Sequence, residues 1–460
     1  MLRLKQATLL IGDLAALYLG LYTALFLRYW QMPGKNLVEF ILPMTQLLFL
    51  AAIILFIAGA YDINKTKNNW AFFQRIVVAA SIWMGLGIIY FYILPNIGIA
   101  PKTILLLTTL VGFGILMLWR CLYNKFISTA LLRSNIIFAG ITDEICELIN
   151  LIRAEPQSGY FVIGIISKVP VSQQLNEKLQ GICIGATINE INQKTQTTAS
   201  IIVISPEFEN EQNLLKELYE SLFRQASIVS LSDFYESFMK RIPPFTFSEG
   251  WFVANLHEQQ KKVYDQFKIL VDYFLGVILG IIFIAISPFA ALAIKINSKG
   301  PIFFCQNRVG RHGVNFKVYK LRTMKVLAAD GSAETQGPQF AANDDSRITA
   351  VGKFLRKTRI DELPQFINIL KGQMSLIGPR PERPEFVRQL TEKMPYYALR
   401  HLVKPGLTGW AQIHSAYYGT IEENLKKLEY DLFYIKHRNF TLDASIILRT
   451  VATVLKMMGR

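Results

Sequence analysis

The N-terminal part of the chain contains four apolar stretches, each close to the length that crosses a bilayer. They are Thr8–Phe26, Ile41–Ala60, Ile76–Leu94 and Thr103–Trp119. A helix needs about 20 consecutive apolar residues to span the hydrocarbon core. The first stretch is long and lacks a small-residue cleavage site, so we expect a retained helix and not a signal peptide. The pattern predicts an N-terminal four-helix transmembrane bundle over residues 1–133.

Basic residues in the flanks of these stretches predict the orientation of the bundle. Eight lie on one side: Arg3, Lys5, Lys65, Lys67, Arg75, Arg120, Lys125 and Arg133. Three lie on the other: Arg28, Lys35 and Lys102. Because Lys and Arg accumulate in cytoplasmic loops, both ends of the bundle are expected in the cytoplasm. The lone acid within the four stretches, Asp13, is expected to pack between helices or to snorkel, and a transporter would need more polar groups near the midplane.

From Asn135 the pattern changes to short apolar runs that alternate with helical segments. Strands are expected at Ile136–Ala139, Tyr160–Ile166, Ile201–Ile204 and Ile228–Leu231, with helices at Asp143–Arg153 and Glu211–Gln225. This alternation predicts a central α/β, Rossmann-like domain, which with its linker covers residues 134–255. Its first loop reads Gly140-Ile141-Thr142-Asp143 and lacks the glycines of a dinucleotide site. We therefore expect a structural, oligomerising or regulatory role, with a second copy of the chain among the candidate partners.

A fifth apolar segment, Ile269–Ile296, is long enough to span a membrane but has basic flanks at both ends. One crossing cannot place both flanks in the cytoplasm. Ser287-Pro288 lies within the segment, and proline removes a helical hydrogen bond and bends the helix. The pattern favours a re-entrant membrane helix over residues 269–296, broken at Ser287 and Pro288. A kinked spanning helix is the alternative.

Composition supports a membrane location. Hydrophobic residues make up 52% of the chain and charged residues 18%, below the roughly 25% of soluble domains. The net charge of +15 is divided as +8 in residues 1–133, −6 in 134–255 and +13 in 256–460. Basic charge beside apolar segments favours an anionic membrane lipid or a phosphorylated ligand, and no nucleic acid is expected as a partner. The four cysteines form no C-x-x-C pair, which argues against a disulfide framework or a zinc site.

Five motifs follow the fifth apolar segment. In chain order they are Gln306–Gly313, Tyr319–Met324, Thr358–Gln365, Ser375–Pro381 and Lys404–Trp410. In this order and spacing, the set closely resembles the bacterial sugar transferase family, the large monotopic polyprenyl-phosphate phosphoglycosyl transferases. The likeness covers roughly residues 265–460 and implies an α+β catalytic domain over residues 256–460.

Asp361 and Glu362 are the candidate catalytic pair. They precede Pro364 and an apolar run, which predicts Asp361 at or near a helix N-terminus, where a carboxylate is kept ionised and a phosphate can bind. Two acids and substrate phosphates also suit Mg²⁺, so both residues are candidate metal ligands. In isolation, an Asp N-cap followed by an exposed Glu would be the favoured interpretation of such a pair, and the matched motifs around it reverse that preference. The resemblance assigns Asp361 the role of nucleophile, with Glu362 in support.

Three basic residues are candidates for substrate binding. Arg380 stands between two prolines, where its guanidinium is held stiffly, and the resemblance assigns it to the nucleotide sugar; a surface ion pair is the alternative. Lys320 and Arg322 alternate along an expected strand and share one face, either near the active site or in solvent.

The resemblance implies an enzyme of the bacterial inner membrane whose catalytic domain faces the cytoplasm. It would transfer a hexose 1-phosphate from a UDP-sugar to undecaprenyl phosphate, release UMP, and start an exopolysaccharide, capsule, or lipopolysaccharide O-antigen repeat unit. A catalytically silent scaffold or nucleotide-sugar sensor is the rival hypothesis, and the intact acidic pair counts against it.

Overall fold

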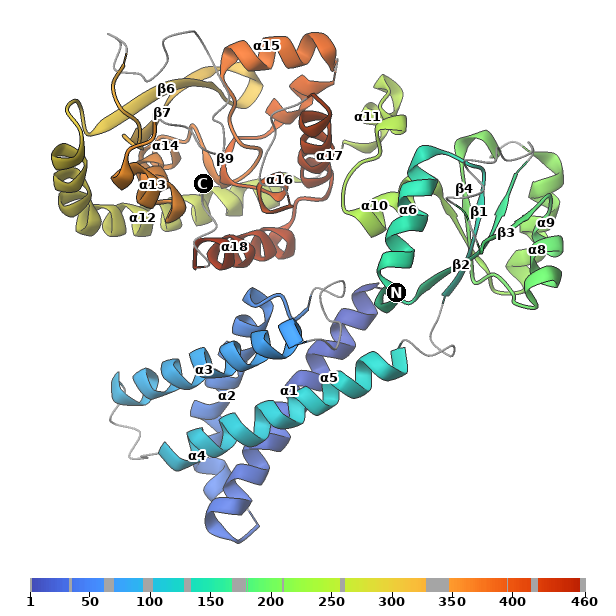
Figure 1. The fold of residues 1–460 in the computed structure, drawn as a ribbon, viewed down its shortest axis with the longest axis horizontal. Coiled ribbons are helices and arrows are strands. Elements are labelled where there is room, and N and C mark those ends of the chain that lie inside the picture. The colour runs from blue at the N-terminus through green and yellow to red at the C-terminus, as the bar shows by residue number, and fades with distance from the viewer. Residues whose placement is uncertain are drawn as a thin grey trace. The chain divides into compact units, whose positions relative to one another are not determined.

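The computed structural model describes residues 2–32, 35–61, 70–93, 102–127, 134–167, 179, 181–208, 211–256, 261–327, 347–394, 396–414 and 421–455. These residues are mostly helical and divide into two compact units, Met1–Phe234 and Tyr235–Arg460 (Figure 1). The first unit holds several apolar helices and a parallel sheet. The second holds the predicted site residues.

The apolar helices of the first unit follow the predicted stretches. They are α1 (Leu2–Tyr29), α2 (Lys35–Ile57), α3 (Trp70–Ile93) and α4 (Lys102–Leu107), which continues through a π-helical turn at Thr108–Gly112 into α5 (Phe113–Ile127). All four stretches are long and apolar enough to cross a membrane. Their buried side chains, among them Leu17, Leu48 and Trp83, form one apolar cluster. The transmembrane arrangement stays a prediction.

Asp13 lies in this cluster, where it pairs with Arg120. Arg120 donates from Nε to Asp13 Oδ1 at 2.9 Å and from Nη1 to the carbonyl of Ala60 at 2.8 Å, and both charged side chains are almost fully buried. Asp13 therefore ties α1 to α5, the packing role expected of it. Arg120, counted above as a flanking charge, is a buried partner instead. Of the other flanking residues, Lys65, Lys67 and Arg133 lie outside the described residues.

The parallel sheet has five strands in the order β3-β2-β1-β4-β5. The strands are β1 (Ser134–Ala139), β2 (Tyr160–Ile166), β3 (Cys183–Gly185), β4 (Ile201–Ile204) and β5 (Ser227–Ser230), and the helices are α6 (Asp143–Ala154), α8 (Ile188–Thr195) and α9 (Gln212–Phe223). Apolar residues of β1 are buried along nearly its whole length, as expected for a parallel strand covered on both faces. The predicted parallel sheet is confirmed.

The crevice where such a sheet would bind a ligand is filled by the chain itself. Parallel sheets bind ligands beyond the carboxyl ends of the strands where the strand order reverses, here β1 and β4. Gly140 ends β1 with φ +115°, and a Cβ atom there would collide with the side chain of Ser205 and lie 3.5 Å from Phe208. Ser205 and Phe208 follow β4, and both are buried. This packing agrees with the missing glycine fingerprint.

The second unit is an α+β assembly around two small sheets. Its helices are α10 (Leu231–Met239, which begins in the first unit), α11 (Glu249–Asn255), α12 (Lys262–Asn297), α13 (Ala350–Lys357), α14 (Phe366–Leu370), α15 (Pro384–Lys393), α16 (Trp410–His414), α17 (Ile421–His437) and α18 (Phe440–Leu455). Strands β6 (Phe303–Val309) and β7 (Asn315–Leu321) form an antiparallel hairpin, and β8 (Ser375–Ile377) pairs in parallel with β9 (Gly406–Thr408). The hairpin and the β8–β9 pair carry four of the five motifs identified in the sequence, and the fifth, Thr358–Gln365, follows α13.

Residues 240–255, which we call the strap, pack onto the C-terminal helices of this unit. Ile242 and Phe252 join a core cluster that contains Leu432 of α17. Arg241 forms a buried ion pair with Glu429 at 2.7 Å. The division between compact units therefore falls before the strap, whereas the boundary predicted from the sequence, 255/256, falls after it.

Helix α12 is continuous through Pro288. It bends instead of breaking: Figure 1 shows it changing direction in its second half, while the helix assignment runs unbroken from Lys262 to Asn297. Ser287 Oγ donates to the carbonyl of Ile284 at 3.4 Å. Many large apolar side chains of α12 are exposed, including Leu270, Phe274 and Phe289. Whether this helix re-enters or spans the membrane stays a prediction.

Candidate active site

The predicted acidic pair lies in a short 3₁₀ helix, Ile360–Gln365, that continues into α14. Arg359 precedes it with φ +60°, a left-handed conformation that non-glycine residues seldom adopt. This residue reverses the chain after α13 and places Asp361 and Glu362 in the first turn of the next helix. Both acids are buried, with 7% and 6% of their surface exposed. The predicted position near a helix N-terminus is therefore correct, although the helix begins as a 3₁₀ turn.

Three cations hold the Glu362 carboxylate. Arg380 approaches Oε1 at 2.8 Å, Lys320 approaches the same oxygen at 3.0 Å, and Arg359 approaches Oε2 at 3.4 Å. Burial alone would raise the pKa of Glu362, but Arg380, Lys320 and Arg359 outweigh it and hold the pKa well below its usual value. Glu362 is therefore ionised at neutral pH and fixed in position. Burial lowers the pKa of Lys320, against the pull of Glu362.

The environment of Asp361 shifts its pKa in the opposite direction from that of Glu362. Burial, and then the neighbouring Glu362 charge, raise its pKa to about 6, while Lys320, Arg356 and Arg359 act in the other direction. Its Oδ1 atom is buried and has no hydrogen-bond partner among the described residues. A buried polar atom without a partner is costly and calls for an explanation. At pH 7 Asp361 is still mostly ionised, so it offers an unshielded carboxylate oxygen.

Helix α14 packs against α12 and thereby sets the distance of the acidic pair from that helix. Gly280 of α12 faces Phe366 so closely that a Cβ atom would lie 3.0 Å from its ring. Phe283, one turn farther, contacts the Phe366 ring with centroids 5.6 Å apart and packs in one apolar cluster with Ile360. Asp361 follows Ile360 directly. The acidic pair is thus anchored to the middle of the longest apolar helix.

A buried arginine, Arg400, holds the backbone of Arg380 in place. Arg400 donates from Nη2 to the carbonyl of Arg380 at 2.9 Å and to Asp431 Oδ2 at 2.8 Å. Its Nη1 contacts the hydroxyl of Tyr397 at 2.6 Å. Arg400 and Asp431 are almost fully buried, so this contact fixes the backbone that presents Arg380 to Glu362.

Glu382 forms a second buried anionic centre next to Arg380. Lys427 of α17 and Arg308 of β6 both pair with its carboxylate, Arg308 at 3.4 Å. Although burial opposes it, the charges of Lys427, Arg308 and Arg400 lower the pKa of Glu382 to about 2. The loop Gly378–Glu382 is therefore held on both sides, and Arg380 projects from it toward Glu362.

The structure brings four of the predicted residues together and leaves three elsewhere. Asp361, Glu362, Lys320 and Arg380 form one cluster. Strand β7 ends at Leu321, so Arg322 leaves the strand and its guanidinium donates to the carbonyls of Ser298 and Lys299 at 2.7 and 3.0 Å, just after α12. Ser287 and Pro288 lie within α12.

Sequence reasoning missed several charged residues of the site and its support. Arg359 was not assigned to Glu362, and four others were given no role: Arg308, Glu382, Arg400 and Asp431. Arg308 and Glu382 stand within or beside the quoted motifs, which was the available signal. Arg400 and Asp431 lie in segments whose pattern resembles ordinary solvated helices.

The acidic pair also bears on metal binding. No group of three or more His, Cys, Asp or Glu that could hold a metal is found among the described residues. Mg²⁺ commonly uses one or two carboxylates together with substrate phosphates and waters. The unpartnered Oδ1 of Asp361 fits such a ligand, whereas the Glu362 oxygens already face three cations.

Comparison with known proteins covers the part of the chain that holds this site. The family model described as bacterial sugar transferase matches residues 263–457. An Aeromonas hydrophila UDP-N-acetylgalactosamine-undecaprenyl-phosphate N-acetylgalactosaminephosphotransferase is 42% identical over 45% of this chain and 49% of its own length. UDP-glucose:undecaprenyl-phosphate glucose-1-phosphate transferases from Klebsiella pneumoniae and Caulobacter vibrioides are 29% and 39% identical, over 96% and 42% of this chain.

The extent of these matches differs. The chain spans about half the length of the Aeromonas relative and 37% of an Escherichia coli UDP-glucose:undecaprenyl-phosphate glucose-1-phosphate transferase that is 45% identical. It covers 93% of the Klebsiella relative and 70% of the Caulobacter relative. The matched region contains the whole acidic pair and its cationic surround. The chain therefore belongs to the bacterial sugar transferase family.

Proposed function

We propose that this protein is a phosphoglycosyl transferase that moves a hexose 1-phosphate from a UDP-sugar to undecaprenyl phosphate and releases UMP. The names of its relatives supply both substrate classes. The observation that carries the proposal is the buried, unpartnered Asp361 oxygen beside a Glu362 held by three cations. A silent scaffold would have no need for an ionised carboxylate in so costly a position.

The proposed reaction proceeds in two displacements. Asp361 attacks the phosphorus next to the sugar, an Asp361–phosphorus bond forms, and the bond to the UMP oxygen breaks. The phosphate oxygen of undecaprenyl phosphate then attacks the same phosphorus, and Asp361 leaves. One difficult displacement is thereby divided into two easier ones. Arg380 and Lys320, which Glu362 holds in position, would bind the phosphate oxygens of the UDP-sugar.

Magnesium is part of the proposal. When bound, Mg²⁺ would neutralise charge on the phosphate oxygens of the substrate. Asp361 would be its protein ligand, through the oxygen that has no hydrogen-bond partner among the described residues. Glu362, whose oxygens face three cations, would act by holding Lys320, Arg359 and Arg380 in place.

The location proposed for the protein is the bacterial inner membrane, with the catalytic unit on the cytoplasmic side. The acidic pair is anchored to α12, whose exposed apolar side chains suit lipid, and a re-entrant α12 would bring the soluble donor and the lipid phosphate to one interface. Lys262→Cys and Lys299→Cys, made separately, should both be labelled from the cytoplasm. Labelling of either one only from the periplasm would replace the re-entrant arrangement with a spanning one.

The proposed activity is tested by UMP release. Purified protein is incubated with Mg²⁺, undecaprenyl phosphate and a panel of UDP-sugars, and both UMP and the lipid product are measured. One sugar should be turned over well above the others. Tight binding of a UDP-sugar without any UMP release across the panel would favour the sensor hypothesis. The product would start a surface polysaccharide.

A further inference from the structure

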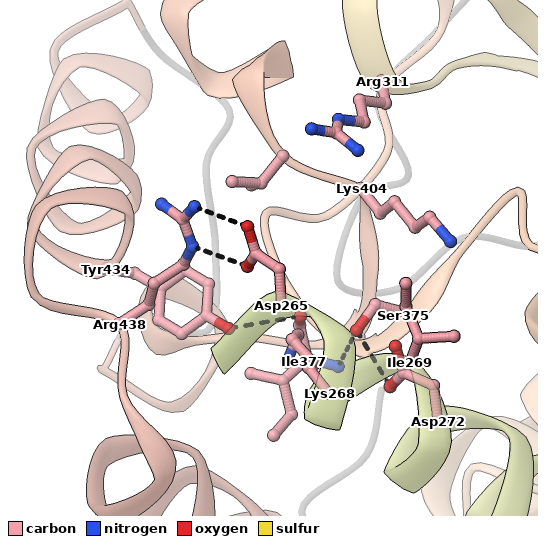
Figure 2. Close-up of a pocket in the computed structure, with 11 residues that line it drawn as sticks. Asp265, Lys268, Ile269, Asp272, Arg311, Ser375, Ile377, Lys404, Tyr434 and Arg438 are labelled. Atoms are coloured by element: carbon pink, nitrogen blue, oxygen red, sulfur yellow. Dashed lines mark hydrogen bonds and ion pairs between the residues drawn. The ribbon is translucent and has the colours of Figure 1, made fainter. Parts of the chain in front are cut away.

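A second charged cavity lies beside the first turns of α12, away from the acidic pair. Its walls include Lys268 and Asp272 of α12, Arg438 after α17, and Arg311 and Lys404 from two loops (Figure 2). It offers about 60 Å³ to water-sized groups, several times the roughly 10–15 Å³ that one water needs. The cavity can therefore hold a group as large as a phosphate.

Most of the charges in this cavity are already paired. Lys268 pairs with Asp443 at 2.7 Å, and Arg438 pairs with Asp265 at 3.3 Å. Asp272 Oδ1 accepts hydrogen bonds from Ser375 Oγ at 3.0 Å and from the backbone N–H of Leu376 at 2.9 Å, so it secures β8.

Two cations remain available. Lys404 Nζ has no hydrogen-bond or ion-pair partner among the described residues, and Arg311 uses only Nε, which donates to the carbonyl of Leu402 at 3.2 Å. Figure 2 shows both on the side of the cavity opposite α12. Two cationic groups with donors still open favour an anion with several oxygens.

The surface next to the cavity is apolar. Ile269 lines the cavity and is 40% exposed, and the neighbouring Leu270 and Phe274 are 66% and 67% exposed. A ligand that fits both surfaces has an anionic head and a hydrocarbon tail. We propose that this cavity binds the phosphate headgroup of an anionic membrane phospholipid, with its acyl chains along the exposed face of α12.

This site is separate from the proposed reaction centre. Asp272 and Phe283 are eleven residues apart on α12, which corresponds to roughly 16 Å at 1.5 Å per residue. Phe283 marks the level of the acidic pair. The lipid would hold the N-terminal half of α12 at the membrane surface while leaving Asp361 free for its substrates.

Native mass spectrometry of the full-length protein in detergent tests this proposal. Phosphatidylglycerol, zwitterionic phosphatidylcholine and inorganic phosphate are each titrated onto the wild type and onto an Arg311→Gln/Lys404→Gln double variant. The wild type should retain one phosphatidylglycerol in preference to phosphatidylcholine. At about 1 kcal/mol per basic residue near anionic lipid, the double variant should bind it about thirtyfold more weakly.

Two controls keep the result specific. Lys295→Gln removes an exposed charge from the other end of α12 and should leave retention unchanged, and Lys404→Arg should keep most of it. Equal retention by wild type and double variant, or an equal loss in Lys295→Gln, overturns the proposal. Complete displacement of the lipid by millimolar inorganic phosphate would also overturn it, because the cavity would then be a site for soluble phosphate.

Discussion

The sheet domain and the catalytic unit differ in how side chains are packed at the position where each would bind a ligand. At the end of β1, where a parallel sheet would bind a ligand, Gly140 is packed against Ser205 and Phe208. In the catalytic unit, Asp361 is buried with an oxygen that has no partner among the described residues, beside a Glu362 that has three. Ser205 Oγ is also buried without a hydrogen-bond partner among the described residues, but it is a neutral hydroxyl, whereas the unpartnered oxygen of Asp361 belongs to a carboxylate. Burying a charged group costs more than burying a hydroxyl, so chemistry is expected at Asp361.

Exchanging one acid in each region is the strongest way to break this comparison. Asp361→Asn should lower UMP release by about 10³-fold or more, because the variant lacks the nucleophile. Without lipid acceptor, the wild type should release about one UMP per site and carry a phosphosugar on Asp361. Asp143→Asn, an exposed acid of α6, is the matched control and should behave as wild type. Normal turnover by Asp361→Asn, or an adduct on another residue, would refute the mechanism.

Removing the buried partner in the strap is expected to have the next largest effect. Arg241→Ala removes the buried ion pair with Glu429 and should destabilise the second unit by about 3–5 kcal/mol. Thermal unfolding in detergent measures this, with Lys216→Ala on the exposed side of α9 as control.

A chain that begins at Tyr235 should fold and release UMP from the UDP-sugar, since residues 134–234 are predicted to supply no chemical group to the reaction. A chain that begins at Leu256 should be markedly less stable, and equal stability of the two would show that the strap is dispensable.

The free-energy cost of burying the Asp361 carboxylate can be measured as a pH-dependent difference in the free energy of unfolding. The folded-state pKa of Asp361 is about 6 against an ordinary 3.8, so the wild type loses stability as the pH rises from about 4 through 6. Asp361→Asn should therefore be more stable than wild type by about 3 kcal/mol above pH 7, although inactive. The gain should vanish near pH 4. Chemical unfolding at both pH values checks this, and a variant less stable than wild type at pH 8 would contradict the raised pKa.

The pH profile gives the smallest expected effect. Because the attacking carboxylate must be ionised, kcat/KM should fall about tenfold per pH unit below a pKa of about 6. Glu362, whose pKa is held low, should add no second inflection in that range. UMP release between pH 4.5 and 8 measures this. A midpoint near 4 would place Asp361 in a more solvated setting than its burial implies.

Local patterns were enough to predict much of the fold. The strands Tyr160–Ile166 and Ile201–Ile204 have the predicted bounds, whereas β3 was missed because Cys183–Gly185 is too short to show a period. The acidic pair was found because a motif marks it. The rest of the site depends on burial and on long-range contacts: Arg400 meets Asp431 across 31 positions, and the strap's Arg241 meets Glu429 across 188. Arg322 departed from the prediction because the strand ended one residue early.

The contact between Gly280 and Phe366 makes bilayer thickness a variable of catalysis. It joins the acidic pair rigidly to α12, so with α12 in the membrane as proposed, the height of Asp361 above the hydrocarbon depends on how deeply that helix settles. Hydrophobic mismatch changes this depth, because a helix tilts or shifts to match thicker or thinner lipid. Turnover in nanodiscs should then pass through an optimum as acyl chain length is varied. The same enzyme would respond to membrane composition without any dedicated sensor.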